Sequence, residues 1–391
     1  MKLTHGGRSS ARRISGTSRT VKRLSALGAL ALVAVVTSGC SPSEAVRFGW
    51  PEGVTPQATE MRHLWQWACI AALIMGVFVW GLIFWAITFH RRKDNKNESG
   101  PVDPDEEFPR QTGYNVPLEL AYTAMPFVMI AVLFYFTVIV QTNVDNKEPN
   151  PPVVVDVTAF QWNWKFGYNT VQLADGTQIV KAEDAKKGSP FDLQASRGTY
   201  EHDGHEKELP GPAGGRDQEV RDYLVFDKIE TLGTSSEIPI LVLPTDTRIQ
   251  FDLASADVIH SFWVPEFLYK RDVMPFPKQN HQDPSFQIEK IEREGAFVGR
   301  CAEMCGTYHA MMNFEVRAVK PEVFESYIRY RQANPTKTNA EALSAVCQQP
   351  QSVTTVPFET RRVADTDVPE DLGDARNTTL PNCSLPKAEE N

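Results

Sequence analysis

The sequence predicts a two-helix transmembrane hairpin that carries an all-β extracytoplasmic domain. Two apolar stretches near the front, residues 68–89 and 120–140, are each long enough to cross about 30 Å of hydrocarbon as a helix. Short segments rich in β-branched residues follow, separated by turn residues, which is typical of a β-sandwich or Greek-key barrel. A late cluster of Cys, His and Met then indicates a metal centre on the β domain.

Residues 1–39 have the pattern of an export signal. Arginine and lysine side chains precede an apolar run over residues 24–36, which is too short to span a bilayer comfortably. The run ends in Thr37-Ser-Gly-Cys40, similar to a bacterial lipoprotein cleavage box, although Leu is usual in place of Thr37. We therefore expect Cys40 to be lipidated, with residues 40–63 outside the membrane. The alternative is an ordinary signal peptide with an incidental cysteine.

The two spans have an orientation that the flanking residues predict. The first helix, expected over residues 64–90, has tryptophans near both ends, as in interfacial aromatic belts. Three basic residues follow it at Arg91-Arg-Lys93, so the loop 91–116 is expected in the cytoplasm. The second helix, expected over residues 117–142, contains Pro126, which a membrane helix tolerates. The rest of the chain then lies outside.

Residues 143–320 are expected to form the β domain. The predicted strands cover residues 153–160, 238–243, 248–253, 286–291, 296–300 and 313–319. Residues 170–235 interrupt them with a charged, Gly-rich insertion, interpreted as a surface excursion or a partner-binding flap. Its two histidines, His202 and His205, are expected to be exposed.

The C-terminal part, residues 321–391, is expected to be a short helix over residues 321–331 and a polar, Pro-rich tail. The tail contains Cys347 and Cys383. Because the chain is outside the cytoplasm here, where disulfides form and persist, we expect these two cysteines to pair.

Composition excludes some classes of function. The chain has 391 residues and a formal net charge of −9, with a mean hydropathy of −0.31. A net acidic chain is a poor nucleic-acid binder and a plausible partner for a basic protein. No C-x-x-C-H motif occurs, so no c-type haem is attached to this chain.

Most of the candidate metal ligands lie in one segment, Cys301-Ala-Glu-Met-Cys305-Gly-Thr-Tyr-His309-Ala-Met-Met312. Thiolate and thioether are soft ligands that suit copper(I), and imidazole suits copper in either oxidation state. Two thiolates can bridge two coppers, which then need a second imidazole; His260, in Asp257-Val-Ile-His-Ser, is the candidate. A disulfide between the two cysteines, or a zinc site, is the alternative. A disulfide leaves His309 and Met312 unexplained, and structural zinc sites do not use Met.

Together these motifs resemble subunit II of haem–copper cytochrome c oxidase of the aa3 type. The resemblance covers residues 64–320 without the insertion. It rests on the copper loop, on Asp257-Val-Ile-His-Ser with Trp263-Val-Pro, and on Phe160-Gln-Trp-Asn-Trp-Lys-Phe-Gly-Tyr168. It also rests on the helix start Leu118-Glu-Leu-Ala-Tyr-Thr, with Tyr122 where Trp is usual. The lipoprotein signal, the insertion and the tail resemble the actinobacterial branch.

The resemblance implies a cupredoxin-like domain with a dinuclear copper A centre. Cys301 and Cys305 would bridge the two metals, and His260 and His309 would each bind one. Met312 and the Glu303 backbone carbonyl would be weak ligands. The Glu303 side chain is then expected to bind a magnesium ion shared with subunit I, with Asp272 nearby; the alternative is that Glu303 contributes only its backbone.

Two more roles follow from the resemblance. Trp162 would be the point where electrons arrive, although Trp162 and Trp164 are two residues apart, so on a strand they share one face and one of them could simply pack in the core. Glu119 would be a proton-uptake group at the cytoplasmic start of the second helix. The alternative is an ordinary carboxylate near a helix N-terminus, where the dipole favours it.

The implied function is that of the electron-accepting subunit of a proton-translocating terminal oxidase. Haem a, haem a3 and copper B would lie in subunit I, because the remaining histidines of this chain cannot build such sites. Expected partners are subunits I and III, membrane lipid, and cytochrome c or a membrane-bound c-type cytochrome of a quinol–cytochrome c reductase supercomplex. The expected location is a bacterial cell membrane, crossed twice, with the copper domain outside.

Three other functions share features with this sequence. A quinol oxidase subunit II shares the fold but lacks the copper ligands. A membrane-anchored copper carrier or assembly protein would need an exposed, exchangeable site. Nitrous oxide reductase has the same copper loop but lacks the helix hairpin and needs a His-rich second domain.

Overall fold

The structure is a computed structural model that describes residues 44, 46–90, 113–181, 229–275, 282–357 and 375–385. It also gives the backbone of short strands within residues 186–187, 199–202, 205–208 and 226–227. The predicted export signal, Cys40 and nearly all of the expected cytoplasmic loop lie outside the described residues.

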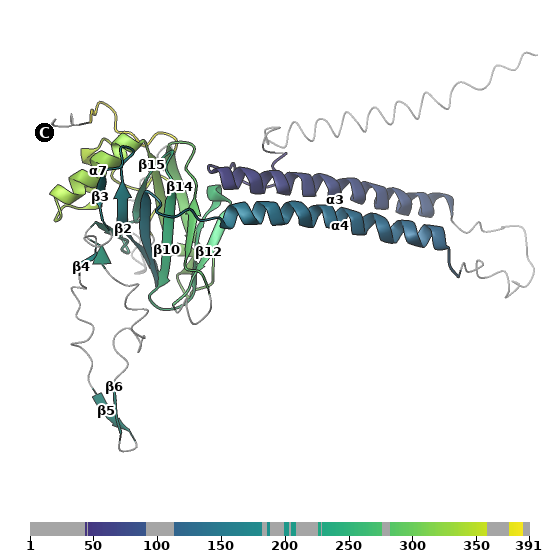
Figure 1. Ribbon diagram of the computed structural model, residues 1–391, viewed down its shortest axis with the longest axis horizontal. Helices are drawn as coiled ribbons and strands as arrows, with labels where there is room; N and C mark the ends of the chain where they lie inside the picture. The colour runs from purple at the N-terminus through teal and green to yellow at the C-terminus, as the bar shows by residue number, and fades with distance from the viewer. Residues whose placement is uncertain are drawn as a thin grey trace, which may run out of the picture. The chain divides into compact units, whose positions relative to one another are not determined.

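Two long helices lie side by side (Figure 1): α3 (Pro56–Phe89) and α4 (Val116–Asp145). Both are long and apolar enough to cross a membrane, as expected. The Thr55 hydroxyl caps α3 by accepting a hydrogen bond from the Ala58 N–H at 3.1 Å. Both helices also have proline in the first turn, where its missing N–H costs nothing. Their apolar side chains are exposed in the isolated chain, which fits a surface that faces lipid or other membrane helices.

Two sheets form the β domain. The first has the strand order β13-β10-β1-β2-β3, with β8 also paired to β2. Its strands are β1 (Val153–Phe160), β2 (Asn163–Gln172), β3 (Gln178–Val180), β8 (Glu230–Leu232), β10 (Ile249–Ser255) and β13 (Ser285–Ile288). The second has the order β12-β11-β14-β15-β9. Its strands are β9 (Ile240–Pro244), β11 (His260–Val264), β12 (Tyr269–Val273), β14 (Gly295–Cys301) and β15 (Asn313–Val319).

Aromatic side chains from both sheets fill the space between them. Trp164 on β2 meets Phe314 on β15 with ring centroids 5.1 Å apart, and Phe251 on β10 meets Phe262 on β11 at 5.3 Å. All four side chains are buried. Consecutive strands pair antiparallel in β1–β2, β11–β12 and β14–β15. The pairs β1–β10 and β15–β9 are parallel, so the chain also crosses between the two sheets. The predicted fold class, a helix hairpin with a cupredoxin-like β domain, is confirmed.

The expected insertion, residues 170–235, differs from the structure at both ends. Strand β2 continues to Gln172, and β3 and β8 both pair with it, so these residues belong to the first sheet. Within the insertion, β4 (Lys186–Lys187) pairs with β7 (Phe226–Asp227), and β5 (Thr199–His202) pairs with β6 (His205–Glu208). His202 and His205 are directly opposite in the second pair; the structure does not describe their side chains.

The segment after β15 is more ordered than expected. Helix α7 (Pro321–Ala333) agrees with the predicted helix, but a second helix, α8 (Asn339–Ala345), was not predicted. Thr338 and Glu341 form a reciprocal capping box at its start, a signal that the sequence contains. Cys347 and Cys383 form a disulfide with an S–S distance of 2.04 Å.

Short 3-10 turns interrupt the second sheet at two positions. η2 (Pro265–Phe267) connects β11 to β12, and η3 (His309–Met311) lies just before β15. Val54, two residues before α3, contacts η2: its N–H donates to the Glu266 carbonyl at 3.0 Å, and Val54 is buried. The start of the first helix is therefore bound to the β domain.

Candidate copper centre

The candidate ligands come from three neighbouring pieces of the second sheet. His260 begins β11, Cys301 ends β14, and the loop that follows leads through η3 to Met312, just before β15. Two backbone hydrogen bonds close the loop at its base: the Cys301 N–H donates to the Met312 carbonyl at 3.3 Å, and the Ala302 N–H donates to the Ser261 carbonyl at 3.0 Å. Sheet register thus brings together residues about forty positions apart in the sequence.

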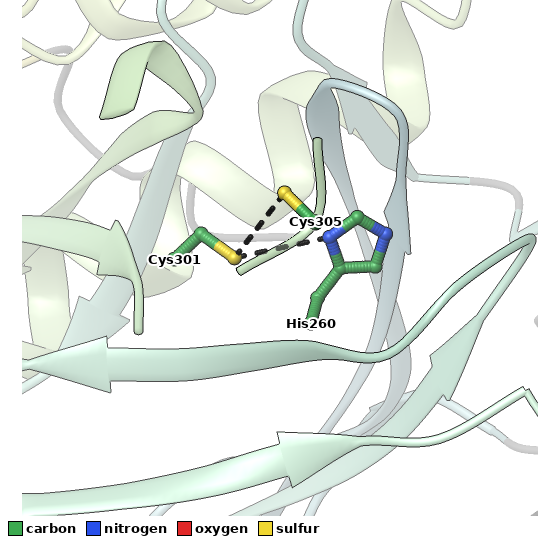
Figure 2. A group of neighbouring side chains, drawn as sticks. All are labelled: His260, Cys301 and Cys305. Atoms are coloured by element: carbon green, nitrogen blue, oxygen red, sulfur yellow. Dashed lines mark hydrogen bonds between the residues drawn. The ribbon is translucent and has the colours of Figure 1, made fainter. Parts of the chain in front are cut away.

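The side chains of the predicted ligands converge on one point. Figure 2 shows His260, Cys301 and Cys305 together, with the His260 Nδ1 atom 3.8 Å from the Cys301 Sγ atom and the two sulfurs 3.8 Å apart. The Cys305 Sγ atom lies 3.6 Å from the His309 Nδ1 atom and 3.9 Å from the Met312 Sδ atom. The two cysteines are free thiols, so they do not form the alternative disulfide.

A backbone carbonyl also lies near the thiols, and most of the candidate ligands are buried. The Glu303 carbonyl oxygen lies 3.2 Å from the Cys301 Sγ atom, while the Glu303 side chain is exposed. His260, both cysteines and Met312 are buried, and His309 is half-buried. Two thiolates, two imidazoles and a thioether form a soft donor set that suits copper better than magnesium or calcium, which prefer oxygen. The residues present therefore fit a copper site.

The two thiols have very different proton affinities without a metal. Burial alone would raise the pKa of Cys301, but the hydrogen bonds with His260 and with the Glu303 backbone lower it to about 7. Burial and the neighbouring Cys301 charge raise the pKa of Cys305 to about 12. The Cys301 charge raises the pKa of Cys305 because two thiolates 3.8 Å apart repel each other. A bound cation offsets that repulsion, so metal binding favours the deprotonation of both thiols.

Asp257 orients the His260 ring, a role that we did not assign to it from the sequence. Its Oδ1 atom is 2.8 Å from the His260 Nε2 atom, which leaves Nδ1 facing the sulfurs. Burial lowers the pKa of His260, but the hydrogen bonds and charges of Asp257 and Cys301 together outweigh burial, so the net pKa is raised. Such carboxylate–histidine pairs fix the ring of a metal ligand. The Asp-x-x-His spacing was the available signal.

Trp162 lies against the metal loop rather than on a regular strand. Its indole N–H donates to the Cys305 carbonyl at 3.0 Å, and the Gln161 side-chain amide donates to the same oxygen at 2.7 Å. Its ring is edge-on to Tyr308 at 5.0 Å and is half-buried. Gly306 has a φ of +118°, and a Cβ atom there would lie 3.1 Å from the Trp162 ring, so this close approach requires glycine.

The two tryptophans therefore do not share one face of one strand. Strand β2 begins only at Asn163, and Trp162 belongs to the preceding turn. The period-two argument fails because it assumes a continuous strand. Trp164 is fully buried in the aromatic core, and its indole N–H donates to the Met312 carbonyl at 3.2 Å.

The remaining predicted site residues lie apart from this cluster. Asp272 is half-buried on β12, opposite Ser261 on β11, so it is one strand away from the copper ligands. Glu119 lies in the first turn of α4, where its Oε1 atom accepts a hydrogen bond from the Asn115 N–H at 3.1 Å. Asn115 in turn accepts from the Leu118 N–H, so Glu119 completes a helix cap.

The chain is similar to known proteins of one family. A family model described as "Cytochrome C oxidase subunit II, periplasmic domain" matches residues 224–319. A Nocardia farcinica protein named "Probable cytochrome c oxidase subunit 2" is 57% identical over 350 residues, covering 88% of this chain and 90% of the relative. A Mycobacterium tuberculosis (strain H37Rv) protein named "Cytochrome c oxidase subunit 2" is 54% identical over 347 residues, covering 89% and 92%.

More distant relatives and solved structures are similar as well. A Corynebacterium glutamicum protein named "Cytochrome c oxidase subunit 2" is 46% identical over 360 residues, covering 89% of this chain and 96% of the relative. The crystal structure of the periplasmic domain of subunit II of cytochrome oxidase from Bradyrhizobium japonicum is 22% identical, with a TM-score of 0.27. It covers 48% of this chain and 97% of that chain.

Proposed function

Since the chain belongs to the cytochrome c oxidase subunit II family, we propose that it is the subunit of that enzyme which accepts electrons from cytochrome c and passes them to subunit I. There the electrons reduce oxygen to water, coupled to proton translocation. The observation that carries this proposal is the buried convergence of His260, Cys301 and Cys305, with His309 and Met312 adjoining.

We propose that these five side chains and the Glu303 carbonyl hold a dinuclear copper A centre. Bound there, the two coppers would supply a site that takes up and releases one electron at a time. The protein residues do the rest: the sheet fixes the ligand positions, Asp257 orients His260, and the buried setting excludes water from the thiolates. Rigid ligands change little when the charge of the site changes, which favours rapid electron transfer.

Trp162 is the proposed point at which electrons arrive. Three features support this role: its ring is half-buried, so one part reaches the surface; it contacts Tyr308; and its N–H is bound to the Cys305 carbonyl. An indole in this position bridges the surface and the metal loop. The donor would be cytochrome c or a membrane-bound c-type cytochrome of a quinol–cytochrome c reductase supercomplex.

The Glu303 side chain is proposed to bind a magnesium ion shared with subunit I. Its exposure next to the buried thiols supports this role, because the side chain is free to reach a ligand outside the chain. Carboxylate oxygen is the kind of ligand that magnesium prefers. Asp272, on β12 opposite Ser261, is a second candidate for the same region.

Glu119 is proposed as a proton-uptake group at the cytoplasmic end of α4. Its hydrogen bond to the Asn115 N–H also supports a purely structural role as a helix cap. Glu119→Gln separates the two roles, because the Gln side chain can still accept the capping hydrogen bond but cannot carry a proton. A fall in proton uptake by the assembled oxidase without loss of α4 stability would support the proton role.

The proposed assembly includes subunits I and III and the surrounding lipid of a bacterial cell membrane, which α3 and α4 cross. Residues 143–320 would form the copper domain on the extracytoplasmic face, with residues 1–39 removed and Cys40 lipidated. Mass spectrometry of the mature N-terminus tests the last two points: a diacylated Cys40 supports them, and an intact residue 1 or an unmodified cysteine contradicts them.

Copper content and electron spin resonance of the purified full-length chain test the central proposal. We expect two coppers per chain, with one unpaired electron shared equally between them. One copper with a single-site spectrum would contradict it and would favour a membrane-anchored copper carrier. The burial of His260, Cys301, Cys305 and Met312 is unfavourable for a carrier, which needs an exchangeable site.

A further inference from the structure

We propose that Trp164 is a positioning residue that fixes Met312, the weak copper ligand, through its indole N–H. The proposal rests on the copper role given above. Its basis is a pair of hydrogen bonds that the sequence alone does not reveal: the indoles of Trp162 and Trp164 both donate to backbone carbonyls of copper ligands. Trp162 donates to Cys305 at the outer side of the loop, and Trp164 donates to Met312 from the core.

Met312 needs such support because its backbone lies outside the regular sheet. It follows η3, with a φ of −79° and a ψ of 70°, and β15 begins only at the next residue. Its N–H donates to the His309 carbonyl at 3.3 Å, and its carbonyl accepts from the Cys301 N–H at 3.3 Å. Both bonds are long. The Trp164 N–H, at 3.2 Å, is a second donor to the same carbonyl and comes from the opposite sheet.

Trp164 is itself held rigidly. Its ring lies parallel to Phe166 at 6.5 Å and edge-on to Phe314 at 5.1 Å and Phe262 at 6.0 Å, and it is fully buried. A buried indole has few alternative rotamers in a packed core, so the direction of its N–H is fixed. The donor therefore defines a position in space rather than following the loop.

The same ring also lies next to a strong ligand. Its centroid is 6.3 Å from that of His260. One rigid side chain thus touches His260 on β11 and Met312 before β15, which are the two ends of the ligand set along the chain. We infer that Trp164 sets the spacing between the imidazole and the thioether, and with it the strength of the thioether bond. Phenylalanine would fill much of the volume but would leave the Met312 carbonyl without its second donor.

Trp164→Phe in the full-length chain tests this role. Phe166→Leu is the matched control, since it removes packing from the same cluster but no N–H donor. The measurements are the electron spin resonance and absorption spectra of the copper-loaded chain, the loss of copper to a chelator, and the thermal unfolding midpoint. The wild-type chain must first show the shared-electron signal; if it does not, the copper role itself fails and not this inference.

We expect Trp164→Phe to shift the copper spectra and to weaken copper binding about tenfold or more, as the loss of a ligand-orienting partner does elsewhere. We expect Phe166→Leu to lower the unfolding midpoint but to keep the wild-type spectra. Equal spectra for Trp164→Phe and wild type would overturn the inference. So would an equal spectral shift in Phe166→Leu, because packing alone would then explain it.

A second variant covers the case in which Trp164→Phe does not fold. Site-specific replacement of Trp164 by 3-benzothienylalanine keeps the shape of the bicyclic ring and exchanges N–H for sulfur. We expect this variant to fold and to show the shifted spectra. A wild-type spectrum from this variant would overturn the inference, since only the hydrogen bond has been removed.

Discussion

The loop before strand β15 and the middle of that strand use buried polar groups in opposite ways. At its start, the copper loop gathers Cys301, Cys305 and His260, whose contacts with one another are 3.8 Å long and involve weak sulfur donors. Farther along, Glu315 and Arg317 form a fully buried ion pair. The Glu315 Oε2 atom also accepts from the Ser352 hydroxyl, the Val353 N–H, and the N–H and hydroxyl of Thr354, at 2.8 to 3.0 Å.

This contrast distinguishes a binding site from a structural clasp. The clasp, defined here as Glu315, Arg317 and residues 349–354, satisfies its charges within the chain, because Arg317 also donates to the carbonyls of Gln349 and Gln351. The copper loop instead gathers sulfur atoms whose contacts with the ligand atoms around them are 3.6 to 3.9 Å long, while the second ring nitrogen of His260 is bound to Asp257 at 2.8 Å. Buried soft donors that converge in this way indicate a metal-binding site.

The largest expected effect comes from breaking the metal end. Cys305→Ser removes one of the two thiolates proposed to bridge the coppers, and a serine hydroxyl would not replace it because it is a hard donor that stays protonated. We expect the shared-electron signal and the oxidase turnover to be lost. Cys69→Ser is the control, since Cys69 is a free cysteine on α3, and it should keep both. Retention of the signal in Cys305→Ser would contradict the bridging role.

Breaking the clasp should damage stability instead. Glu315→Ala leaves Arg317 buried without its partner, and removing one member of a buried pair costs about 3–5 kcal/mol of unfolding free energy. The exposed pair Glu325–Arg329 is the control, because Glu325→Ala should cost less than about 1 kcal/mol. Chemical denaturation measures both. A copper spectrum altered in the folded fraction of Glu315→Ala would show that the copper loop and the clasp are not independent.

Removing the Cys347–Cys383 disulfide should lower the unfolding free energy by less than breaking the clasp. Replacing both Cys347 and Cys383 with serine removes a link across a sequence separation of 36, which typically costs about 2–4 kcal/mol. Backbone hydrogen bonds between the two segments remain, such as the Leu380 N–H to the Cys347 carbonyl at 2.7 Å. We expect a lower unfolding midpoint and full copper loading. Unchanged stability would mean that those hydrogen bonds alone fix the segment 375–385.

The smallest expected effect concerns Glu266, which belongs neither to the copper loop nor to the clasp. Its Oε2 atom is buried without a hydrogen-bond partner among the described residues, and burial raises the pKa of its carboxyl. A raised pKa means that the folded state binds the proton more tightly than the unfolded state. This contribution to stability is complete below the unfolded pKa of about 4.3 and is lost as the pH rises through the folded pKa.

Glu266→Gln should therefore gain stability relative to wild type as the pH rises from 4 to 7. Unfolding midpoints of both chains across this range measure the effect. A difference between the two chains that does not change with pH would mean that the carboxyl ionises as readily in the folded chain as in the unfolded one.

Much of the molecule could be predicted from local pattern. Uncharged apolar runs indicate the two helices, since a bilayer has no water for unpaired backbone groups. The five ligand side chains could be proposed because soft donors at close spacing have few other uses. Asp257 and Trp164 could not be given their roles, because those depend on which strands are neighbours and which carbonyl faces a ring. Helix α8 was missed although its capping box was readable, since the polar composition of the tail outweighed it.

The clasp also constrains the order in which the protein can be completed. Glu315 lies on the strand that follows the copper loop, yet four of the hydrogen bonds to its carboxylate come from residues 352–354. The disulfide of Cys347 likewise cannot form before Cys383 has been added to the chain. A chain emerging from the membrane translocation machinery would leave the Glu315 carboxylate without these hydrogen bonds until residues 352–354 have crossed. Prematurely terminated chains would contain every copper ligand and still lack a finished scaffold. Proteases would therefore be expected to remove them before they compete for copper.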